Sequence, residues 1–396
     1  MKNLEHKNQP GDELSPSPKP AQHTLTDRLS APFIGAALLL FLALGLVSSV
    51  TSILDGSLTL KPDNLTWSSF LDGKLSSEVN DNLAKTPLPE RAAQAGRYVL
   101  WVSIGDTGKN VRVGCPDWLF LADELRVYPQ RELNALARAQ NVEALNRALA
   151  QRGMTLVVAV VPDKSRIEAA HLCGLNRAQR FANRAEQWLA QLNAAGVATV
   201  DLQPVLQALV DAGQEAYLRT DTHWNEAGAE AAANAIAQRI KKLDLKLTPE
   251  QGFNVTRKEP VSRAGDLVRL AGLDTLPLSV QPRADHVAVS VFMPLDGASS
   301  SAADDLFGDA GLPNTALIGS SFSRNSNFLP FLEAALRTKI GDFALDGGGF
   351  SKSAQAYFAS AAFRDTPPRL IVWEIPERVL EEPWVGADMT VSVAQK

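Results

Sequence analysis

The stretch Met154–Lys164, MTLVVAVVPDK, is apolar at every position from Leu156 to Val161. Its β-branched residues favour a strand over a helix. A strand that is apolar on both faces is typical of a parallel sheet covered by helices on both sides. Helical patterns that end at Gly153 and Gly196 flank it. We therefore expect a central, fully buried strand here.

Strand and helix patterns alternate on both sides of this strand. We expect helices at 130–153, 177–196, 226–243, 327–341 and 351–363, and strands at 98–105, within 111–121, and at 197–201, 314–319, 342–346 and 369–378. This order predicts an α/β fold, a parallel sheet with helices on both faces. The pattern breaks at about residues 248–312, where short strand-like runs lie among prolines and small polar residues, including a loop at 296–311. We interpret 248–312 as a β-rich insertion.

The N-terminal region predicts a membrane anchor. No charged residue occurs between Ser30 and Leu54, and residues 31–54 approach the length of a membrane-spanning helix. A buried core helix would show a polar face. A cleaved signal peptide is the other alternative, but about thirty polar residues precede the apolar run and no clear cleavage site follows it.

The flanking residues suggest the organisation around this anchor. Residues 1–30 are rich in Pro and Ser and predict a disordered tail, residues 55–95 a juxtamembrane linker, and residues 96–396 the main domain. Basic residues precede the apolar run, so we expect a single-pass inner-membrane protein with its N-terminus in the cytoplasm and its domain in the periplasm.

Charge and cysteine content narrow the function further. The 396 residues carry a formal net charge of −5, which gives no indication of nucleic-acid binding. The only cysteines, Cys115 and Cys173, could pair, because an exported domain meets a compartment that permits disulfides. Two unrelated buried thiols are the alternative. Their spacing shows no metal pattern.

Histidine is scarce in the part predicted to be exported. Only His171, His223 and His286 follow the anchor, and only His223 combines an acid at short spacing, Asp221, with a place at a helix start. Asn225 can cap the helix that follows, which places the pair on a loop before a helix. There Asp221 could orient the imidazole as a base. A structural histidine at a helix entrance is the alternative, and the spacing alone does not separate the two.

A second turn supplies a candidate nucleophile. In ALIGSSFSRNSNF, residues 316–328, a strand ends, a glycine turns, and Ser320, Ser321 and Ser323 precede a helix. A serine here would lie near backbone N–H groups able to bind an oxyanion, although the serines could merely cap the helix. Combined with Asp221 and His223, the turn predicts a Ser-His-Asp acyl-transfer site. No zinc motif, phosphate loop or dinucleotide fingerprint occurs, so we expect no metal and no cofactor.

These motifs together resemble a known family. DTHWN at 221–225 and GSSFS at 319–323 resemble the SGNH-hydrolase-like acetyltransferases that O-acetylate exported polysaccharides, the alginate O-acetyltransferase family of AlgJ and AlgX. VGCPDWLFL at 113–121, VVPDKSRI at 160–167 and the segment 345–378 also resemble family motifs. The resemblance covers roughly residues 95–380. The sequence departs from the family pattern at 116–118, which reads Pro-Asp-Trp, and at Ser320.

The resemblance implies an enzyme and its partners. It implies Ser321 as nucleophile, His223 as base and Asp221 as orienting acid, in a rearranged topology with Asp and His before Ser. It implies acetyl transfer through an acetyl-serine to hydroxyls of an exported polysaccharide, alginate or a similar exopolysaccharide such as cellulose. The acetyl group would come through a membrane-bound O-acyltransferase, beside other subunits of polymer synthesis and export. The chain looks like the membrane-anchored AlgJ-type members.

Substrate contacts are predicted at four residues near these motifs. Arg324 and Asn325 could face a sugar or remain on a helix surface, Trp224 could stack on a sugar or pack the loop, and Gly348 lies in a glycine turn that would let backbone approach a ligand. We interpret Lys164 as a solvated strand end. His171 and His286 are expected to be structural.

Two other functions share these features. A periplasmic acetylesterase or deacetylase would use the same triad with water as acceptor. A non-catalytic scaffold of an export complex would keep the fold and bind polymer without turnover.

Overall fold

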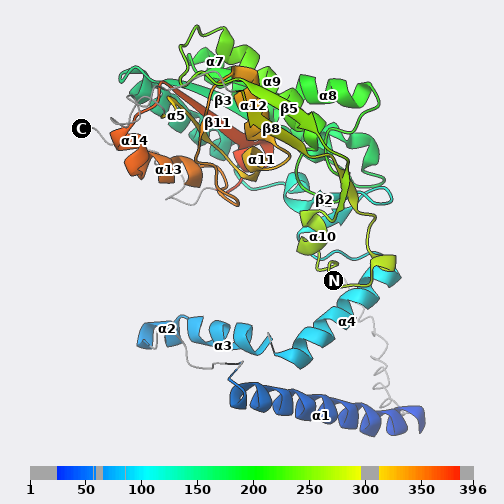
Figure 1. Ribbon diagram of the computed structural model, residues 1–396. Helices are drawn as coiled ribbons and strands as arrows, with labels where there is room; N and C mark the ends of the chain where they lie inside the picture. Colours follow the sequence, from blue (N-terminus) through cyan, green and yellow to red (C-terminus); the bar gives the residue numbers. More distant parts are fainter. Residues whose placement is uncertain (1–24, 57, 59–65, 85, 296–311, 384–396) are drawn as a thin grey trace, which may run out of the picture. The chain divides into compact units, whose positions relative to one another are not determined.

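The computed structural model describes residues 25–56, 58, 66–84, 86–295 and 312–383. The chain divides into two compact units, Met1–Gly96 and Arg97–Lys396. The first contains α1 (Leu25–Leu54), α2 (Trp67–Leu71), α3 (Lys74–Ala84) and most of α4 (Pro87–Ile104). Figure 1 labels these elements and those of the second unit.

Helix α1 contains a segment, Gly35–Leu54, that is long and apolar enough to cross a membrane, with a mean hydropathy of 2.4. Only 6% of the residues in this segment are buried, unlike those of a core helix. A signal sequence would be equally long and apolar. The helix begins at Leu25, so residues 25–30, predicted as part of a disordered tail, are helical. The rest of that predicted tail lies outside the described residues.

A five-stranded parallel sheet forms the centre of the second unit. Its strand order is β10-β9-β11-β3-β4, with β3 at Thr155–Val161, β4 at Ala198–Asp201, β9 at Thr315–Ile318, β10 at Gly341–Asp342 and β11 at Leu370–Pro376. Strand β11 lies between β3 and β9 along most of its length. Every residue of β11 is buried, as expected for a central strand that is apolar at every position except Glu374.

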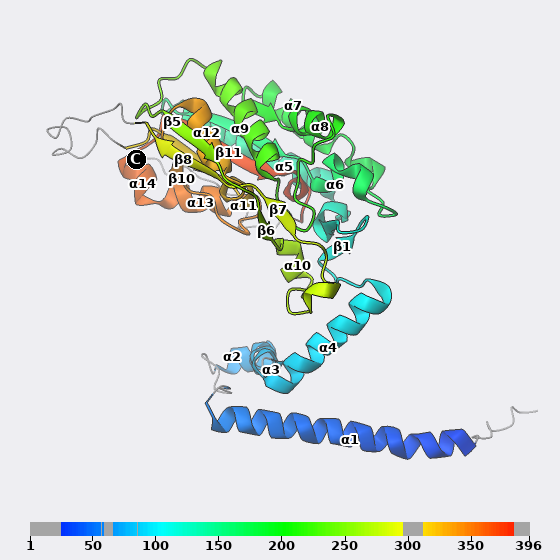
Figure 2. The same ribbon diagram turned by 45° about the vertical axis from the view of Figure 1, so that its right-hand side comes forward.

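Helices cover both faces of this sheet (Figures 1 and 2). Alternate residues of β3 point to opposite sides, so Leu156, Val158 and Val160 join one core cluster and Val157, Ala159 and Val161 join the other. The first cluster includes residues of α5 (Arg131–Ala150), α7 (Arg184–Ala194), α13 (Lys352–Ala359) and α14 (Ala361–Asp365). The second includes residues of α8 (Gln203–Asp211), α9 (Glu226–Lys241) and α12 (Phe328–Leu336). The α/β fold predicted from the sequence is confirmed.

The segment at 248–295 adds two antiparallel ribbons and a short helix. Strand β5 (Phe253–Arg257) pairs with β8 (Ser290–Pro294), and β6 (Val261–Arg263) pairs with β7 (Asp285–Val287). Helix α10 (Asp266–Leu270) lies between the two strands of the second ribbon in sequence. The predicted loop at 296–311 lies outside the described residues.

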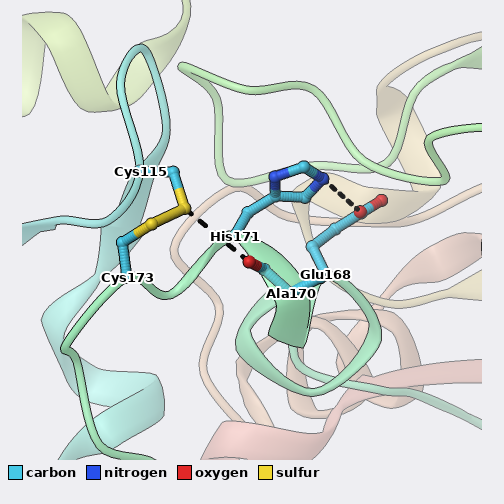
Figure 3. The surroundings of a disulfide bond; sticks show 5 residues. All are labelled: Cys115, Glu168, Ala170, His171 and Cys173. Atoms are coloured by element: carbon cyan, nitrogen blue, oxygen red, sulfur yellow. Dashed lines mark hydrogen bonds and ion pairs between the residues drawn. A yellow bond between two sulfur atoms is a disulfide. The ribbon is translucent and has the colours of Figure 1, made fainter.

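A small hairpin precedes the sheet in sequence, and a disulfide joins it to the segment between β3 and β4. Strands β1 (Val111–Val113) and β2 (Leu119–Leu121) pair antiparallel, and Cys115 in their connection is bonded to Cys173. Figure 3 shows this disulfide beside His171, whose ring stacks on Trp118 with centroids 4.0 Å apart. The Cys115 N–H donates to the His171 carbonyl over 2.8 Å. The disulfide joins two segments that are 58 residues apart in sequence.

One predicted element is wrong. Residues 98–105 were expected to form a strand, but Tyr98–Ile104 form the last two turns of α4. The apolar run YVLWVSI suits either structure by composition. It follows ERAAQAGR, residues 90–97, in which all but Gly96 favour a helix, and an established helix extends through β-branched residues at a small cost per residue.

Candidate active site

The turn after β9 presents a serine at the carboxyl edge of the sheet. Gly319 and Ser320 lead into the single-turn helix α11 (Ser321–Arg324), and Ser321 is only partly buried. The Ser320 hydroxyl caps this turn by accepting from the Phe322 N–H over 3.2 Å. An added Cβ at Gly319 would lie 2.5 Å from the Ser323 hydroxyl, so the turn requires glycine for space. Strand and glycine together therefore expose Ser321 while its neighbours stay packed.

A buried carboxylate holds this turn from the neighbouring strand. Glu374 of β11 accepts hydrogen bonds from the Ser320 N–H at 2.7 Å, from the Ser320 hydroxyl at 2.9 Å and from the Ser323 hydroxyl at 3.0 Å. Burial raises the pKa of Glu374, while these hydrogen bonds act in the opposite direction. No catalytic motif in the sequence includes this residue. A single acid inside a strand that is otherwise apolar was the available signal.

Asp221 and His223 lie on the loop before α9. The His223 Nδ1–H donates to Asp221 Oδ1 over 2.7 Å, and the His223 backbone N–H donates to the same oxygen over 3.0 Å. Asn225 caps α9 by accepting from the Gly228 N–H over 2.9 Å. The Asp221 carboxylate is fully buried, and the His223 side chain is nearly so. The bent loop therefore brings together two side chains that are two residues apart.

The histidine connects the two turns. Because a carboxylate only accepts, the Nδ1 of His223 carries the proton and its Nε2 is the acceptor. The Ser321 hydroxyl lies 2.7 Å from that Nε2 and donates to it. The ring of Phe322 packs edge-on against the imidazole, with centroids 4.9 Å apart. The structure thus arranges Asp221, His223 and Ser321 in one continuous hydrogen-bonded series.

Electrostatics keep the acid of this series ionised. Burial alone would raise the pKa of Asp221, but hydrogen bonds from His223, the positive charge that its ring carries when protonated and the Asp266 N–H hold that pKa well below its usual range. An ionised Asp221 can stabilise the imidazolium that forms when His223 takes a proton. The pKa of Asp266 is raised, first by burial and then by the negative charge of Asp221.

Lys164 is the clearest correction to the sequence analysis. It was interpreted as a solvated strand end, but its side chain is fully buried beneath the base-carrying turn. Its Nζ donates to the carbonyl oxygens of Leu119, Arg219 and Asp221 at 2.6, 2.8 and 3.0 Å. Burial lowers the pKa of Lys164 to about 8, although nearby acids, Glu124 first, act to raise it. Three carbonyl oxygens, one from β2 and two from the loop before α9, converge on the Lys164 Nζ. Hydrogen bonds to them offset the cost of burying this cation.

The inserted segment also forms hydrogen bonds with the loop that carries Asp221 and His223. Asp285 on β7 accepts from the Arg219 N–H at 2.7 Å and from the Thr220 N–H at 3.0 Å. At the start of α10, the Asp266 N–H donates to Asp221 Oδ2 over 3.1 Å. An added Cβ at Gly265 would lie 2.1 Å from the Thr220 carbonyl oxygen, so the two backbones are in direct contact. The insertion therefore forms part of the site.

A metal does not suit these residues well. Asp221, His223 and Asp266 offer ligand atoms within 4.8 Å of one another. However, both ring nitrogens of His223 are already engaged, one with Asp221 and the other with Ser321. A metal ligated by the imidazole would break one of these contacts. The arrangement is that of a proton relay with a nucleophile at its end.

The predicted substrate contacts fall into two groups. Trp224 is fully buried between Phe322 and Phe328, so it packs the loop and offers no face to a sugar. Gly348 is also buried, and its N–H donates to the Leu345 carbonyl over 3.2 Å, which is the contact of a tight turn. For both residues the structure corrects the substrate-binding prediction.

Arg324 and Asn325 lie beside the nucleophile. The Arg324 side chain is 49% exposed and lies 3.6 Å from Asp346, at the start of the glycine turn. The Asn325 Nδ2 donates to the Ser321 carbonyl over 2.8 Å and thus supports the serine. Arg324 is accessible to a ligand, whereas part of the Asn325 amide is used within the turn. The other two histidines of this unit, His171 and His286, lie outside the hydrogen-bonded series.

Comparisons with known proteins agree with this geometry. Residues 111–377 match the family model of the SGNH hydrolase-like domain, acetyltransferase AlgX. The “Probable alginate O-acetylase AlgJ” of Pseudomonas aeruginosa is 35% identical over 325 residues, which cover 78% of this chain and 81% of that one. Its counterpart in Pseudomonas syringae is 34% identical over 273 residues, which cover 68% and 69%.

Two solved structures are also similar. The O-acetyltransferase domain of Pseudomonas putida AlgJ superposes with a TM-score of 0.60 at 29% sequence identity, covering 70% of this chain and 94% of that one. Pseudomonas aeruginosa AlgX gives a TM-score of 0.51 at 25% identity, covering 67% of this chain and 62% of that one.

Proposed function

This chain belongs to the family of SGNH hydrolase-like acetyltransferases represented by AlgX, and from that premise we propose that it O-acetylates an exported polysaccharide, alginate or a similar polymer. The observation that carries the proposal is the hydrogen-bonded series from Asp221 through His223 to a partly exposed Ser321. The names of the relatives support a polysaccharide acceptor.

The first half of the reaction loads the serine. His223 Nε2 takes the Ser321 proton as the hydroxyl oxygen attacks the carbonyl carbon of an acetyl ester. The negative charge that develops on the carbonyl oxygen is stabilised by backbone N–H groups at the turn, the Ser321 N–H first among them. When the tetrahedral intermediate collapses, the bond to the donor oxygen breaks and that oxygen receives the proton from His223. An acetyl-serine remains.

The second half transfers the acetyl group to the polymer. A sugar hydroxyl gives its proton to His223 Nε2 and attacks the acetyl carbon. The bond to the Ser321 oxygen breaks, and the proton returns to that oxygen from His223. Asp221 stays ionised throughout and stabilises the imidazolium in both halves. The exposed Arg324, which lies next to the nucleophile turn, is proposed to face the sugar or its carboxylate.

The N-terminal helix supports an anchored enzyme. A helix with an apolar run from Gly35 to Leu54 would hold the domain at the outer face of the inner membrane, with the preceding residues in the cytoplasm. In that position the enzyme could receive acetyl groups through a membrane-bound O-acyltransferase and act beside the polymer-export subunits. The Cys115–Cys173 disulfide is consistent with an oxidising compartment such as the periplasm.

Incubation with an acetyl-ester donor, with and without oligosaccharide, tests the proposal. Mass spectrometry should detect an acetyl group on Ser321 and acetylated oligosaccharide as product. Release of acetate alone, at the same rate with and without acceptor, would instead identify an esterase. Ser321→Ala should abolish both acetyl-enzyme and product. Undiminished acetylation of the polymer in cells that carry this variant would instead identify a non-catalytic scaffold.

A further inference from the structure

Arg263 connects the buried triad to solvent. It is the last residue of β6 and pairs in register with Asp285 of β7. Its Nη2 lies 3.1 Å from Asp221 Oδ2. The Arg263 side chain is 46% exposed, whereas the Asp221 carboxylate is fully buried. One edge of the guanidinium therefore contacts the catalytic machinery while the rest of the group is accessible.

The accessible part of this group is suited to a carboxylate. A guanidinium has five N–H donors in a planar fork, and within the described residues its hydrogen bond is to Asp221 alone. The Asp221 Oδ2 also accepts the Asp266 N–H, so this oxygen does not depend on Arg263 for its only donor. The remaining guanidinium N–H groups can form the paired hydrogen bonds by which arginine recognises carboxylates.

The position of Arg263 fits an acceptor site. Ser321, His223, Asp221 and Arg263 form a series of three hydrogen bonds, with the reacting oxygen at one end and the guanidinium at the other. An acidic polysaccharide carries carboxylates at the regular spacing of its sugar units. A carboxylate bound at Arg263 would fix the position of a nearby hydroxyl relative to the acetyl-serine, which is how a positioning contact speeds a transfer.

We propose that Arg263 is a specificity-determining residue that binds a carboxylate of the acceptor while its other edge contacts Asp221. The inserted ribbon of β6 and β7 then selects acidic polymers, the uronate class, over neutral ones. This inference rests on the proposed acetyl transfer and names the chemistry of its acceptor.

Calorimetry on the full-length protein in detergent tests this assignment without requiring turnover. The ligands are a uronic-acid tetrasaccharide and its carboxyl-reduced, neutral counterpart. Arg263→Gln should weaken binding of the acidic ligand about tenfold, as expected for the loss of a charge-assisted contact, and leave binding of the neutral one unchanged. Arg263→Lys should retain part of the preference. Arg257→Gln is the matched control, because Arg257 lies on β5 of the same insertion and pairs with Glu230.

A transfer assay separates specificity from an effect on the triad. With 4-nitrophenyl acetate as donor, an effect of Arg263→Gln on the triad lowers the rates with acidic and neutral acceptors by the same factor. Loss of the carboxylate contact instead lowers the ratio of transfer to the acidic acceptor over transfer to the neutral one, and we expect this ratio to fall about tenfold. Equal binding of the acidic ligand by wild type and Arg263→Gln would overturn the assignment, as would no binding by the wild type or equal losses for both ligands. If the binding difference holds while the wild type releases only acetate, the proposed transferase function fails and the carboxylate site stands.

Discussion

The nucleophile turn, residues 319–324, and the base turn, residues 219–225, meet where Ser321 contacts His223. The two turns are supported in different ways. The nucleophile turn follows a strand of the sheet, and one side chain of the adjacent strand, Glu374, accepts three of its hydrogen bonds. The base turn lies outside the sheet, and its supports come from three separate segments through Lys164, Asp266 and Asp285.

This difference follows from where each turn lies. Strands β9 and β11 are in parallel register, so one residue of β11 is fixed beside the turn after β9. The loop before α9 does not follow a strand of this sheet, and side chains distant in sequence, Asp285 of β7 among them, hold it instead. We therefore expect the nucleophile turn to depend on one residue and the base turn to tolerate loss of any one support. The following predictions test this contrast.

The largest effect is expected at the shared series of hydrogen bonds. Asp221→Asn should lower the rate of acetyl transfer by about 10⁴-fold, because an amide favours the wrong tautomer of His223. The fold should survive, as judged by circular dichroism. Formation of acetyl-Ser321, followed by mass spectrometry after rapid quenching, should fall by the same factor. A loss below tenfold would contradict the role of this acid.

The next largest effect is expected at Glu374. Glu374→Gln keeps the size of the side chain but replaces one acceptor oxygen by a donor that faces the serine hydroxyls. We expect kcat to fall by about a hundredfold because the nucleophile turn loses its position. The comparison is direct if urea unfolding shows the variant folded at the assay temperature. Unchanged kcat in a folded variant would mean that β9 alone positions Ser321.

A smaller loss of activity is expected at Lys164. Lys164→Met should lower kcat by about tenfold, because Asp266 and Asp285 still hold the base turn. Its stability should fall more clearly, since three buried carbonyls lose their donor. A larger loss of kcat than that of Glu374→Gln would reverse the contrast between the turns.

The pH dependence of stability gives an independent test of Lys164. Its pKa is lowered to about 8 in the folded protein from 10.5. Between these values the unfolded chain binds more protons than the folded one, so this residue's contribution to stability rises as the pH rises. The difference in unfolding free energy between wild type and Lys164→Met should therefore grow from about pH 7.5 to about pH 9.5. A difference that stays constant would mean that the pKa of Lys164 is unshifted, as for a solvated side chain, and one that shrinks would mean that this pKa is raised.

The smallest effect on stability is expected at Arg324. Its pair with Asp346 is exposed on both sides and separated by 3.6 Å. Arg324→Ala should change the unfolding free energy by less than about 1 kcal/mol. If the side chain faces the polymer, KM for an oligosaccharide should rise about tenfold with kcat nearly unchanged. A change in stability without a change in KM would assign Arg324 to the turn alone.

The sequence predicts the central sheet better than it predicts the side chains that hold the active site in place. The valine-rich run at 155–161 can hardly form anything except a buried strand, and the two loop motifs carry Asp221, His223 and Ser321 visibly. Lys164 was misinterpreted because burial depends on three carbonyls from distant segments, and no local pattern records them. Trp224 was open to both packing and stacking, and only the contact with Phe322 and Phe328 decides between them.

The same reason explains the residues that were missed. Arg263, Asp266 and Asp285 lie in a segment whose sequence shows short strands and polar residues without a motif. Their importance comes from a tertiary contact with residues 219–222, about forty to sixty-five positions earlier in the chain. The family resemblance identified the triad, but the side chains that hold the base turn become visible only in three dimensions.

The close approach of Gly265 to Thr220 has a consequence for evolution and for protein engineering. An added Cβ there would overlap the Thr220 carbonyl, so a substitution of Gly265 requires a movement of the base turn. Residues 263–266 and the base turn are therefore expected to change together. A chimaera that exchanges acceptor preference between relatives should therefore transplant β6, α10, β7 and residues 219–223 as one cassette.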